Sequence, residues 1–212
     1  MGYWRNAMNE LKISILGTGD MGGAIATAIS RRTRHALKVR GAQPGSASAL
    51  KLMDELGVTE ASKQDFLASD IVFVVVPAAA IERVAATLSG YEGIVVAVSV
   101  SGSVGRDGLP SSAERIATVL PEASVVSAFT SIWSNVIREP GKSGKTSVFV
   151  SSDDDKAKEV VSRLATELGF EPVNGGPLST ALYVEVMGMF AVRLATDSGY
   201  GRTISFRAFN AE

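Results

Sequence analysis

The chain of 212 residues contains no cysteine and a single histidine. The absence of cysteine excludes disulfide bonds, a thiolate nucleophile and cysteine-ligated metal sites, and we expect no metal centre. It also fits a reducing compartment, so we expect a cytoplasmic protein. The one histidine, His35, lies between a predicted helix and a predicted strand, which favours a surface or capping role over catalysis.

The sequence also has little net charge and no long uninterrupted apolar run. Its 21 Lys and Arg residues against 22 Asp and Glu residues give a net charge of -1. Such a balance gives no reason to expect nucleic acid or an anionic surface as a partner. The apolar run 71–81 contains Pro77 and is too short to cross a bilayer. We therefore expect neither a nucleic-acid partner nor a membrane partner.

The most informative motif that is present is K-I-S-I-L-G-T-G-D-M-G-G at residues 12–23. A buried-strand pattern ends directly at Gly17, and helical apolar spacing begins a few residues later. The pattern G-x-G-x-x-G between a strand and a helix is typical of dinucleotide-binding turns, whereas a chance glycine-rich turn is the alternative. Gly17 would allow the tight turn, Gly19 the approach of backbone to the diphosphate, and Gly22 the close packing of helix on strand.

Free amide groups at the start of the helix would attract the phosphates. Asp20 lies within this turn and counts among the cofactor-binding residues. Because a carboxylate is an awkward neighbour for a diphosphate, we expect it to cap the helix and to face outward.

Strand and helix patterns alternate along most of the chain, which predicts an α/β fold with a doubly wound, Rossmann-type parallel sheet. Uniformly apolar strands such as 71–76 are covered on both faces, as in parallel sheets. We expect the dinucleotide-binding domain to span 10–176 and a small helical C-terminal portion to span 177–212. The serine- and glycine-containing segment 99–112 is predicted to be a loop at the carboxyl end of a strand, where ligands bind in such sheets. Strands are expected at 13–16, 36–40, 58–59, 71–76, 94–100, 124–129, 146–150 and 171–173. The first helix is expected to end near residue 32, and further helices are expected at 46–56, 64–68, 81–88, 111–120 and 154–168.

A long apolar helix is predicted at 178–196. Its apolar face must pack either on the sheet domain or on a second copy of the chain, and we favour a homodimer. The residues expected on that face are Leu182, Val186, Met187, Phe190 and Leu194.

Five segments in order resemble one known family. These are the glycine turn, D-I-V-F-V-V-V-P at 70–77, V-V-S-A-F-T-S-I at 125–132, V-F-V-S-S-D-D at 148–154 and G-F-E-P-V-N-G-G-P-L at 169–178. Together they resemble the NADP oxidoreductases that use the deazaflavin coenzyme, and the related nucleotide domain of membrane ferric reductases. The resemblance runs from about residue 12 to residue 209. It implies hydride exchange between a nicotinamide and a second flat redox partner, deazaflavin- or flavin-like, with little acid–base chemistry.

The resemblance also assigns roles to residues of this chain. It implies diphosphate contacts at Gly17, Thr18, Gly19, Met21 and Gly22, contacts beside the adenosine and nicotinamide at Val76, Pro77 and Ala78, and a hydride-transfer cleft lined by Ala128, Phe129, Thr130, Ser131 and Ile132.

The chain departs from the family where the 2′-phosphate of NADP is held. The family's Ser-Arg pair is replaced by Ala42 and Gln43, and no Asp or Glu follows between residues 21 and 52 to bind ribose hydroxyls as in NAD enzymes. Because no carboxylate would repel a 2′-phosphate, we favour NADP, with NAD as the alternative. Arg40 with Ser46 would supply a new phosphate site, unless Arg40 is only a solvated cation at the strand end.

A second departure concerns the acceptor. Thr130 stands where relatives often have histidine or asparagine, and Val186 and Gly188 replace hydroxyl-bearing residues of the family's final helix. We expect Thr130 and Ser131 to be the catalytic residues and to hydrogen-bond the acceptor. Trp133 either stacks on a flat substrate or packs in the core.

These observations predict an NAD(P)-dependent oxidoreductase. Two alternatives remain open. One is an NADPH-dependent reductase of a small imine or ketone, for which Tyr183 or Ser131 would donate the proton. The other is a non-catalytic dinucleotide-binding sensor.

Overall fold

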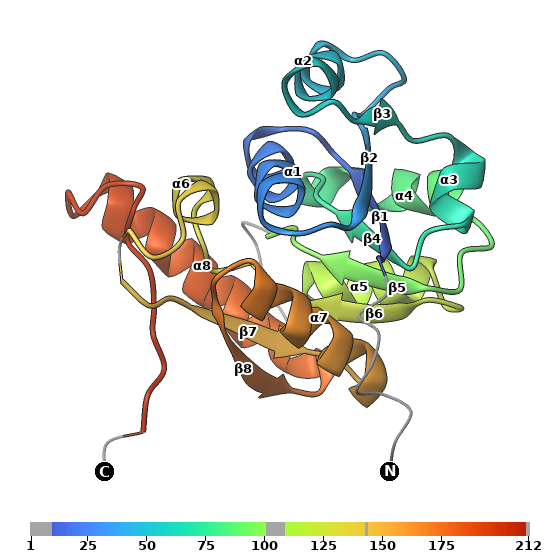
Figure 1. Cartoon of the computed structure of the whole chain (residues 1–212). Coiled ribbons are helices and arrows are strands. Elements are labelled where there is room, and N and C mark those ends of the chain that lie inside the picture. The colour runs from blue at the N-terminus through green and yellow to red at the C-terminus, as the bar shows by residue number, and fades with distance from the viewer. Residues whose placement is uncertain (1–9, 101–108, 143, 211–212) are drawn as a thin grey trace, which may run out of the picture.

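The computed structural model of the chain describes residues 10–100, 109–142 and 144–210. An eight-stranded sheet has the strand order β3-β2-β1-β4-β5-β6-β7-β8 and is flanked by helices (Figure 1). The strands are β1 (Lys12–Leu16), β2 (Ala36–Arg40), β3 (Thr59–Glu60), β4 (Ile71–Val74), β5 (Ile94–Ala97), β6 (Ser124–Ser127), β7 (Ser147–Ser151) and β8 (Glu171–Gly176). The α-helices are α1 (Asp20–Arg32), α2 (Ala47–Leu56), α3 (Lys63–Leu67), α4 (Ile81–Leu88), α5 (Ser112–Val119), α6 (Ser134–Arg138), α7 (Asp155–Glu167) and α8 (Ala181–Thr196). The predicted Rossmann-type α/β fold with a helical C-terminal part is confirmed.

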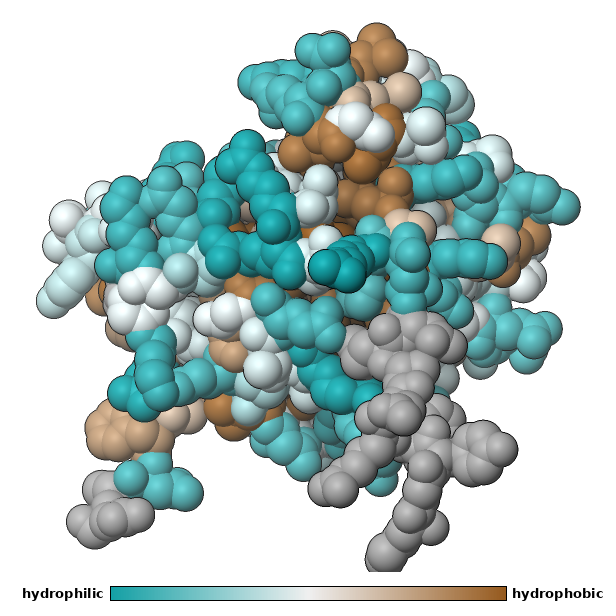
Figure 2. Space-filling view, viewed as in Figure 1, coloured by the Kyte–Doolittle hydropathy of each residue, from teal (hydrophilic) through white to brown (hydrophobic). Residues whose placement is uncertain are grey.

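Alternate residues of the central strands enter two hydrophobic cores, one on each face of the sheet. On β4, Ile71 and Phe73 join one core while Val72 and Val74 join the other. This pattern explains why the strand is apolar at every position, as expected of a parallel strand that is covered on both sides. On the face seen in Figure 2, hydrophobic residues gather below α2, where Met53 and Leu56 are partly buried against the first core.

The last two strands depart from the uniformly parallel sheet that the sequence predicts. The first six strands are mutually parallel, but β7 runs antiparallel to β6, and β8 is parallel to β7. The helix between β6 and β7, α6, has only five residues. It rises by about 7 Å, which is too short to carry the chain back along the sheet before the next strand begins.

Most predicted helices lie within a few residues of the observed ones, but α2 is rotated relative to expectation. The spacing of Leu50, Met53 and Leu56 predicts that they share the inner face. Leu50 is instead 52% exposed, and Ala49 and Leu52 are buried beside the partly buried Met53 and Leu56. The loop predicted at 99–112 falls largely on residues 101–108, which lie outside the described residues.

The C-terminal helix packs on the domain through a face other than its bulky apolar row, which leaves the second copy of the chain as the predicted partner of that row. Its buried residues are Ala181, Val184, Glu185, Gly188 and Ala191. The larger apolar residues predicted to pack include Val186 and Phe190, and both are exposed. Small residues on the inner face let α8 lie close to the domain, and this leaves the bulky row outside.

The segment Leu178–Thr196 is also long and apolar enough to cross a membrane, by length and composition alone. A third of it is buried within the domain. Core helices of soluble proteins have the same composition.

Candidate cofactor and acceptor site

The candidate site lies where the order of the parallel strands reverses. The chain passes from β1 outward to β2 and β3, and then returns to place β4 on the other side of β1. In open α/β sheets a crevice forms at this point, outside the carboxyl ends of the strands. The glycine turn follows β1 and the segment 75–77 follows β4, so the two face each other across it.

The glycines of the turn have the geometry that a tight strand-to-helix connection requires. Gly17 has a φ of +108°, and a Cβ there would lie 2.1 Å from the Val75 carbonyl oxygen. A Cβ on Gly22 would lie 1.8 Å from the Gly17 carbonyl oxygen. By contrast, a Cβ on Gly19 would meet no atom of the described residues within 4 Å. Gly17 and Gly22 are therefore needed by the fold, whereas Gly19 borders open space.

A cavity of about 310 Å³ lies between the glycine turn and α4. Five of the predicted cofactor-binding residues line it, namely Gly17, Thr18, Gly19, Val76 and Pro77. The other described lining residues are Leu16, Ala42, Ser48, Val75, Ala80, Arg83, Val84 and Thr87. No carboxylate is among the described residues of this lining, which therefore suits an anionic ligand.

The remaining predicted cofactor-binding residues are not among the described lining residues of this cavity. Met21 lines a second cavity, described below. Ala78 is partly buried against the second core, and Ala128 is fully buried in the first. Arg40 ends β2, where its carbonyl oxygen accepts a hydrogen bond from the Gly17 N–H at 2.8 Å.

Two lining residues, Arg83 and Ser48, were not singled out by sequence reasoning. The hydroxyl of Ser48 is 2.7 Å from that of Thr18, which joins α2 to the glycine turn. Arg83 lies in the first turn of α4, the helix that follows the Pro77 segment. The sequence signal that could have identified Arg83 is its position in the first turn of the helix that follows β4, because this helix borders the same crevice as the glycine turn.

The expectation that Asp20 caps α1 is wrong. The helix starts at Gly19 with no side-chain cap. The Asp20 carboxylate instead accepts hydrogen bonds from Ser134 Oγ and, at 2.7 Å, from Arg138 Nη2, both on α6. The hydrogen bond from Ser134 and the nearby Arg138 guanidinium hold the pKa of Asp20 below its usual value. Sequence reasoning did not predict α6, and therefore missed both partners.

A second cavity, of about 290 Å³, lies between the segment after β6 and α8. Its described lining is mostly apolar and consists of Met21, Val100, Thr130, Ser131, Ile132, Trp133, Gly188, Met189, Ala191 and Val192. Both predicted catalytic residues, Thr130 and Ser131, are in this lining and are buried. Tyr183, the other proton donor considered, is 73% exposed and is not among the described lining residues.

The backbone around Thr130 is unusual. Phe129 has a φ of +62°, which is rare for a residue other than glycine, and its ring is fixed between Phe73 and Phe170. Strained residues of this kind cluster at functional sites, where the surrounding packing holds them. The hydroxyl oxygen of Thr130 is buried and has no hydrogen-bond partner among the described residues. A buried hydroxyl without a partner is costly, so a ligand atom is a natural partner for it.

Trp133 combines the two roles considered for it. Its ring is partly buried against the first core, and it also lines the second cavity. Its Nε1 is buried without a partner among the described residues, and the Arg202 guanidinium lies 5.7 Å from the ring centroid. The indole is thus held by packing on one side and borders the cavity on the other.

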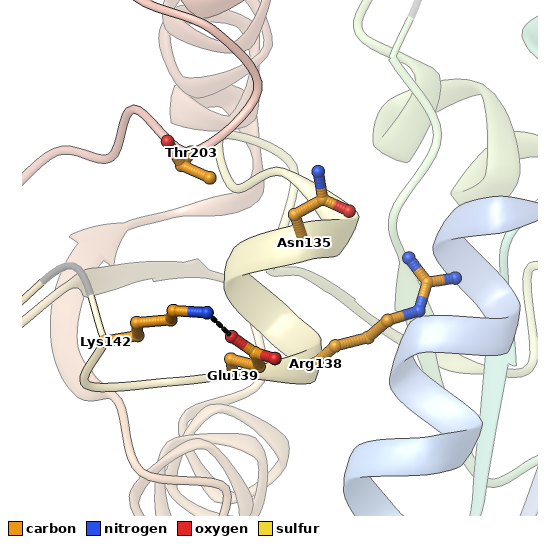
Figure 3. Close-up of a pocket in the computed structure, with 5 residues that line it drawn as sticks. All are labelled: Asn135, Arg138, Glu139, Lys142 and Thr203. Carbon is orange, nitrogen blue, oxygen red and sulfur yellow. Dashed lines mark hydrogen bonds and ion pairs between the residues drawn. The ribbon is translucent and has the colours of Figure 1, made fainter.

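A third cavity, of about 260 Å³, lies beside α6 and is lined by Asn135, Arg138, Glu139, Lys142 and Thr203 (Figure 3). Its two cations are already paired, Arg138 with Asp20 and Lys142 with Glu139 at 2.6 Å. Figure 3 shows Arg138 extending away from this cavity towards α1. The cavity is therefore a poor candidate for binding an anion.

The single histidine lies far from these cavities along the sheet. His35 Nδ1 accepts a hydrogen bond from the Leu11 N–H at 3.2 Å, and Nε2 lies 3.0 Å from a Glu167 carboxylate oxygen. Its side chain is only 5% exposed, so of the two roles expected for it, a surface role and a capping role, the surface role is wrong.

The residues of the site fit a nicotinamide dinucleotide. Gly19 borders open space at the N-terminus of α1, where amide groups and the helix dipole favour phosphate. The adjoining cavity has an apolar floor and no described carboxylate, and the second cavity carries an unpartnered hydroxyl. A dinucleotide bound at the glycine turn would supply hydride chemistry, for which no side-chain acid is required.

Comparison with known proteins places part of the chain in a known family model. Residues 12–102 match the model of the family described as "NADP oxidoreductase coenzyme F420-dependent". The chain is 24% identical over 200 residues to the F420-dependent NADP reductase of Methanocaldococcus jannaschii, covering 84% of this chain and 89% of that protein. It is 25% identical over 205 residues to the metalloreductase STEAP3 of Rattus norvegicus, covering 94% of this chain and 41% of that protein. The chain thus spans about two fifths of the metalloreductase.

A solved structure shows the same fold. A crystal structure described as a candidate F420-dependent NADP reductase from Arthrobacter sp. FB24 superposes with a TM-score of 0.79 at 24% identity, covering 94% of this chain and all of that one. The family match confirms the resemblance inferred from the sequence motifs, the oxidoreductase class and NADP as the cofactor.

Proposed function

We propose that this protein, whose residues 12–102 match the NADP oxidoreductase, coenzyme F420-dependent family, transfers a hydride between NADP(H) and a second, flat redox partner. The observation that carries this proposal is the placement of two cavities around one glycine turn. Gly17 to Gly19 line the first cavity, and Met21 lines the second together with Thr130 and Ser131. One ligand could therefore extend from the turn towards a second ligand near α8.

The chain's own residues would bind and orient both reactants. Amide groups of the glycine turn bind the diphosphate, and Val76 and Pro77 support the nicotinamide side. When bound, NADPH supplies a hydride, which carries two electrons and one proton. The hydroxyls of Thr130 and Ser131 orient the acceptor, while the apolar lining of the second cavity excludes water. Catalysis then rests on positioning, in keeping with a lining that has no described acid or histidine.

We assign the 2′-phosphate of NADP to the surroundings of the first cavity. Arg83 and Ser48 both line this cavity, and the buried Ser46 Oγ near the end of β2 has no partner among the described residues. Arg40 stays a candidate from the sequence because it ends β2. We expect Arg83→Gln to raise the Kd for NADPH about tenfold and to leave that for NADH unchanged, since a charge-assisted hydrogen bond to phosphate contributes about 1.5–3 kcal/mol. Arg31→Gln, at the far end of α1, is the matched control.

A small imine or ketone is the second candidate for the acceptor. The unpartnered Thr130 Oγ supports it, because a buried hydroxyl suits a carbonyl or imine nitrogen. Ser131 is then the remaining proton donor, since Tyr183 points outside the described lining. In this reaction the carbon gains the hydride and the nitrogen or oxygen gains the proton.

One experiment separates the proposed function from its alternatives. The protein is loaded with NADPH and mixed in a stopped-flow instrument with a deazaflavin, a flavin, or a panel of cyclic imines and ketones, while absorbance at the NADPH band is followed. We expect rapid oxidation by the deazaflavin or flavin. Oxidation by imines alone favours the second candidate, and oxidation by none of them indicates a dinucleotide-binding sensor.

We further propose that the protein is a homodimer joined through the outer face of α8. This face carries Tyr183, Val186 and Phe190 in a row at helical spacing, and all three are exposed. The inner face is occupied by the chain's own domain, so a second copy is the occupant that would cover the outer row. Two such helices packed against each other would form a symmetric interface.

A further inference from the structure

The glycine turn contains a carboxylate at a position where the proposed ligand is also anionic. Asp20 is the first residue of α1 and directly follows Gly19, and 68% of its side chain is exposed. The positive end of a helix attracts both a phosphate and a nearby carboxylate, so the two compete for the same amide groups. An uncompensated charge at Asp20 would also repel a diphosphate.

Helix α6 holds both oxygens of this carboxylate. Ser134 Oγ donates to Oδ2, and Arg138 Nη2 donates to Oδ1 at 2.7 Å and to the Asp20 carbonyl oxygen at 3.0 Å. Ser134 is buried, which fixes its hydroxyl, and Arg138 reaches across from α6 to α1 (Figure 3). Since α1 begins without a side-chain cap, the carboxylate leaves the first-turn amide groups free.

We propose that Arg138 and Ser134 are positioning residues for cofactor binding: they draw the Asp20 carboxylate towards α6, and Arg138 neutralises its charge, so that the start of α1 can accept a diphosphate. The inference rests on the proposed binding of NADP(H) at the glycine turn. It goes beyond that function because neither residue lies in the glycine motif, and both belong to a helix more than 110 positions away in the sequence.

The same helix borders the acceptor cavity. Trp133 is the residue at which α6 begins, and Met21 directly follows Asp20; both line the second cavity. The contact between Asp20 and α6 therefore also sets the separation of two walls of that cavity. The ion pair between Asp20 on α1 and Arg138 on α6 therefore connects the glycine turn to a wall of the acceptor cavity.

The test is a set of charge variants, with NADPH binding measured by fluorescence titration at low ionic strength. We expect Arg138→Gln to raise the Kd for NADPH about fivefold, because the negative charge of Asp20 beside the diphosphate then loses its salt bridge. Arg138→Lys keeps the charge and should bind within about twofold of the wild type. The double variant Asp20→Asn with Arg138→Gln removes both charges and should recover binding to within about twofold of Asp20→Asn alone.

Two further readouts separate this electrostatic role from a structural one. In 0.5 M NaCl the deficit of Arg138→Gln should shrink, since salt screens exposed charges. Adenosine 2′-monophosphate, which lacks the diphosphate, should bind equally to wild type and Arg138→Gln. Melting curves show whether each variant folds; if Arg138→Gln does not, a folded Arg138→Lys that loses NADPH binding although it keeps the charge would reject the electrostatic role.

Several results would overturn the inference. Unchanged NADPH binding by Arg138→Gln, no recovery in the double variant, or equal weakening of adenosine 2′-monophosphate would each do so. If the wild-type protein binds no nicotinamide nucleotide, the proposed function itself fails. If it binds NADPH but Arg138→Gln behaves like wild type, only the role of Arg138 is rejected.

Discussion

Gly188 of α8 packs directly on the backbone of Thr130, so closely that a Cβ on Gly188 would lie 2.5 Å from the Thr130 carbonyl oxygen. The C-terminal helix therefore forms a wall of the acceptor cavity instead of standing apart from the sheet domain. A side chain at this position would push α8 away from Thr130 and Ser131, the two residues that we expect to bind the acceptor.

The first prediction concerns this contact. Gly188→Ala should lower the free energy of unfolding by about 1–3 kcal/mol, because the added methyl group meets backbone that cannot rotate away. Gly23→Ala in α1 is the control: its Cβ would only make ordinary contacts, 3.6 Å from Leu52, and alanine favours helix by up to about 1 kcal/mol. Urea denaturation measures both. Equal stability of the two variants would show that α8 is not held against Thr130.

The second prediction separates folding from binding within the glycine turn. Gly19→Ala should fold with wild-type stability, since its Cβ points into open space, and should bind NADPH at least about tenfold more weakly if a diphosphate fills that space. Gly22→Ala should instead destabilise the fold, because its Cβ would lie 1.8 Å from the Gly17 carbonyl oxygen. Thermal melting and fluorescence titration are sufficient. A Gly19→Ala variant with unchanged affinity would place the phosphates elsewhere.

The sequence was sufficient to predict the fold class and the glycine turn. Strands such as 71–74 and the strand–glycine–helix order are local patterns, and local patterns fix the early part of an α/β sheet. The orientation of α8 was not predictable in this way. Its bulky row fits packing either on the domain or on a second copy, and the close contact with Thr130 selects the face with Gly188 and Ala191 as the inner one. The partners of Asp20 were missed for a similar reason, because contacts between α1 and a five-residue helix leave no periodic signal.

The third prediction uses pH. Asp65 is bound by Lys38 Nζ at 2.6 Å and by the Ser62 hydroxyl and amide, and these bonds hold its pKa well below the usual range. A carboxyl group whose pKa is lowered by folding stabilises the protein above its unfolded pKa of about 3.9, and this contribution is lost as the pH falls further towards the folded pKa. Asp65→Asn should thus be less stable than wild type at pH 7, and the difference should shrink below about pH 4.

Urea denaturation at pH 7 and at pH 3 measures this effect. Asp155→Asn is a suitable control, since Asp155 is almost fully exposed and its ion pair with Lys158 is expected to contribute little. A difference between wild type and Asp65→Asn that stays constant with pH would show that the charge of Asp65 does not stabilise the fold.

The fourth prediction tests the proposed dimer. Phe190→Glu should convert the protein to a monomer in sedimentation velocity, because it places a charge within the outer apolar row of α8. Leu50→Glu on α2 is the matched control, since Leu50 is exposed to a similar extent, 52% against 54%, and should leave the dimer intact. Wild-type protein that sediments as a monomer at micromolar concentration would rule out this interface, and binding of that monomer to lipid vesicles would assign the apolar row to a membrane instead.

The central claim is that backbone amide groups at the start of α1 bind the diphosphate of NADP(H). Isothermal titration calorimetry of the folded protein with NADPH, NADP⁺ and NADH tests it most directly. The account predicts one site per chain, with NADPH bound more tightly than NADH. Absence of binding heat with all three at several temperatures, from protein shown to be folded, would contradict it.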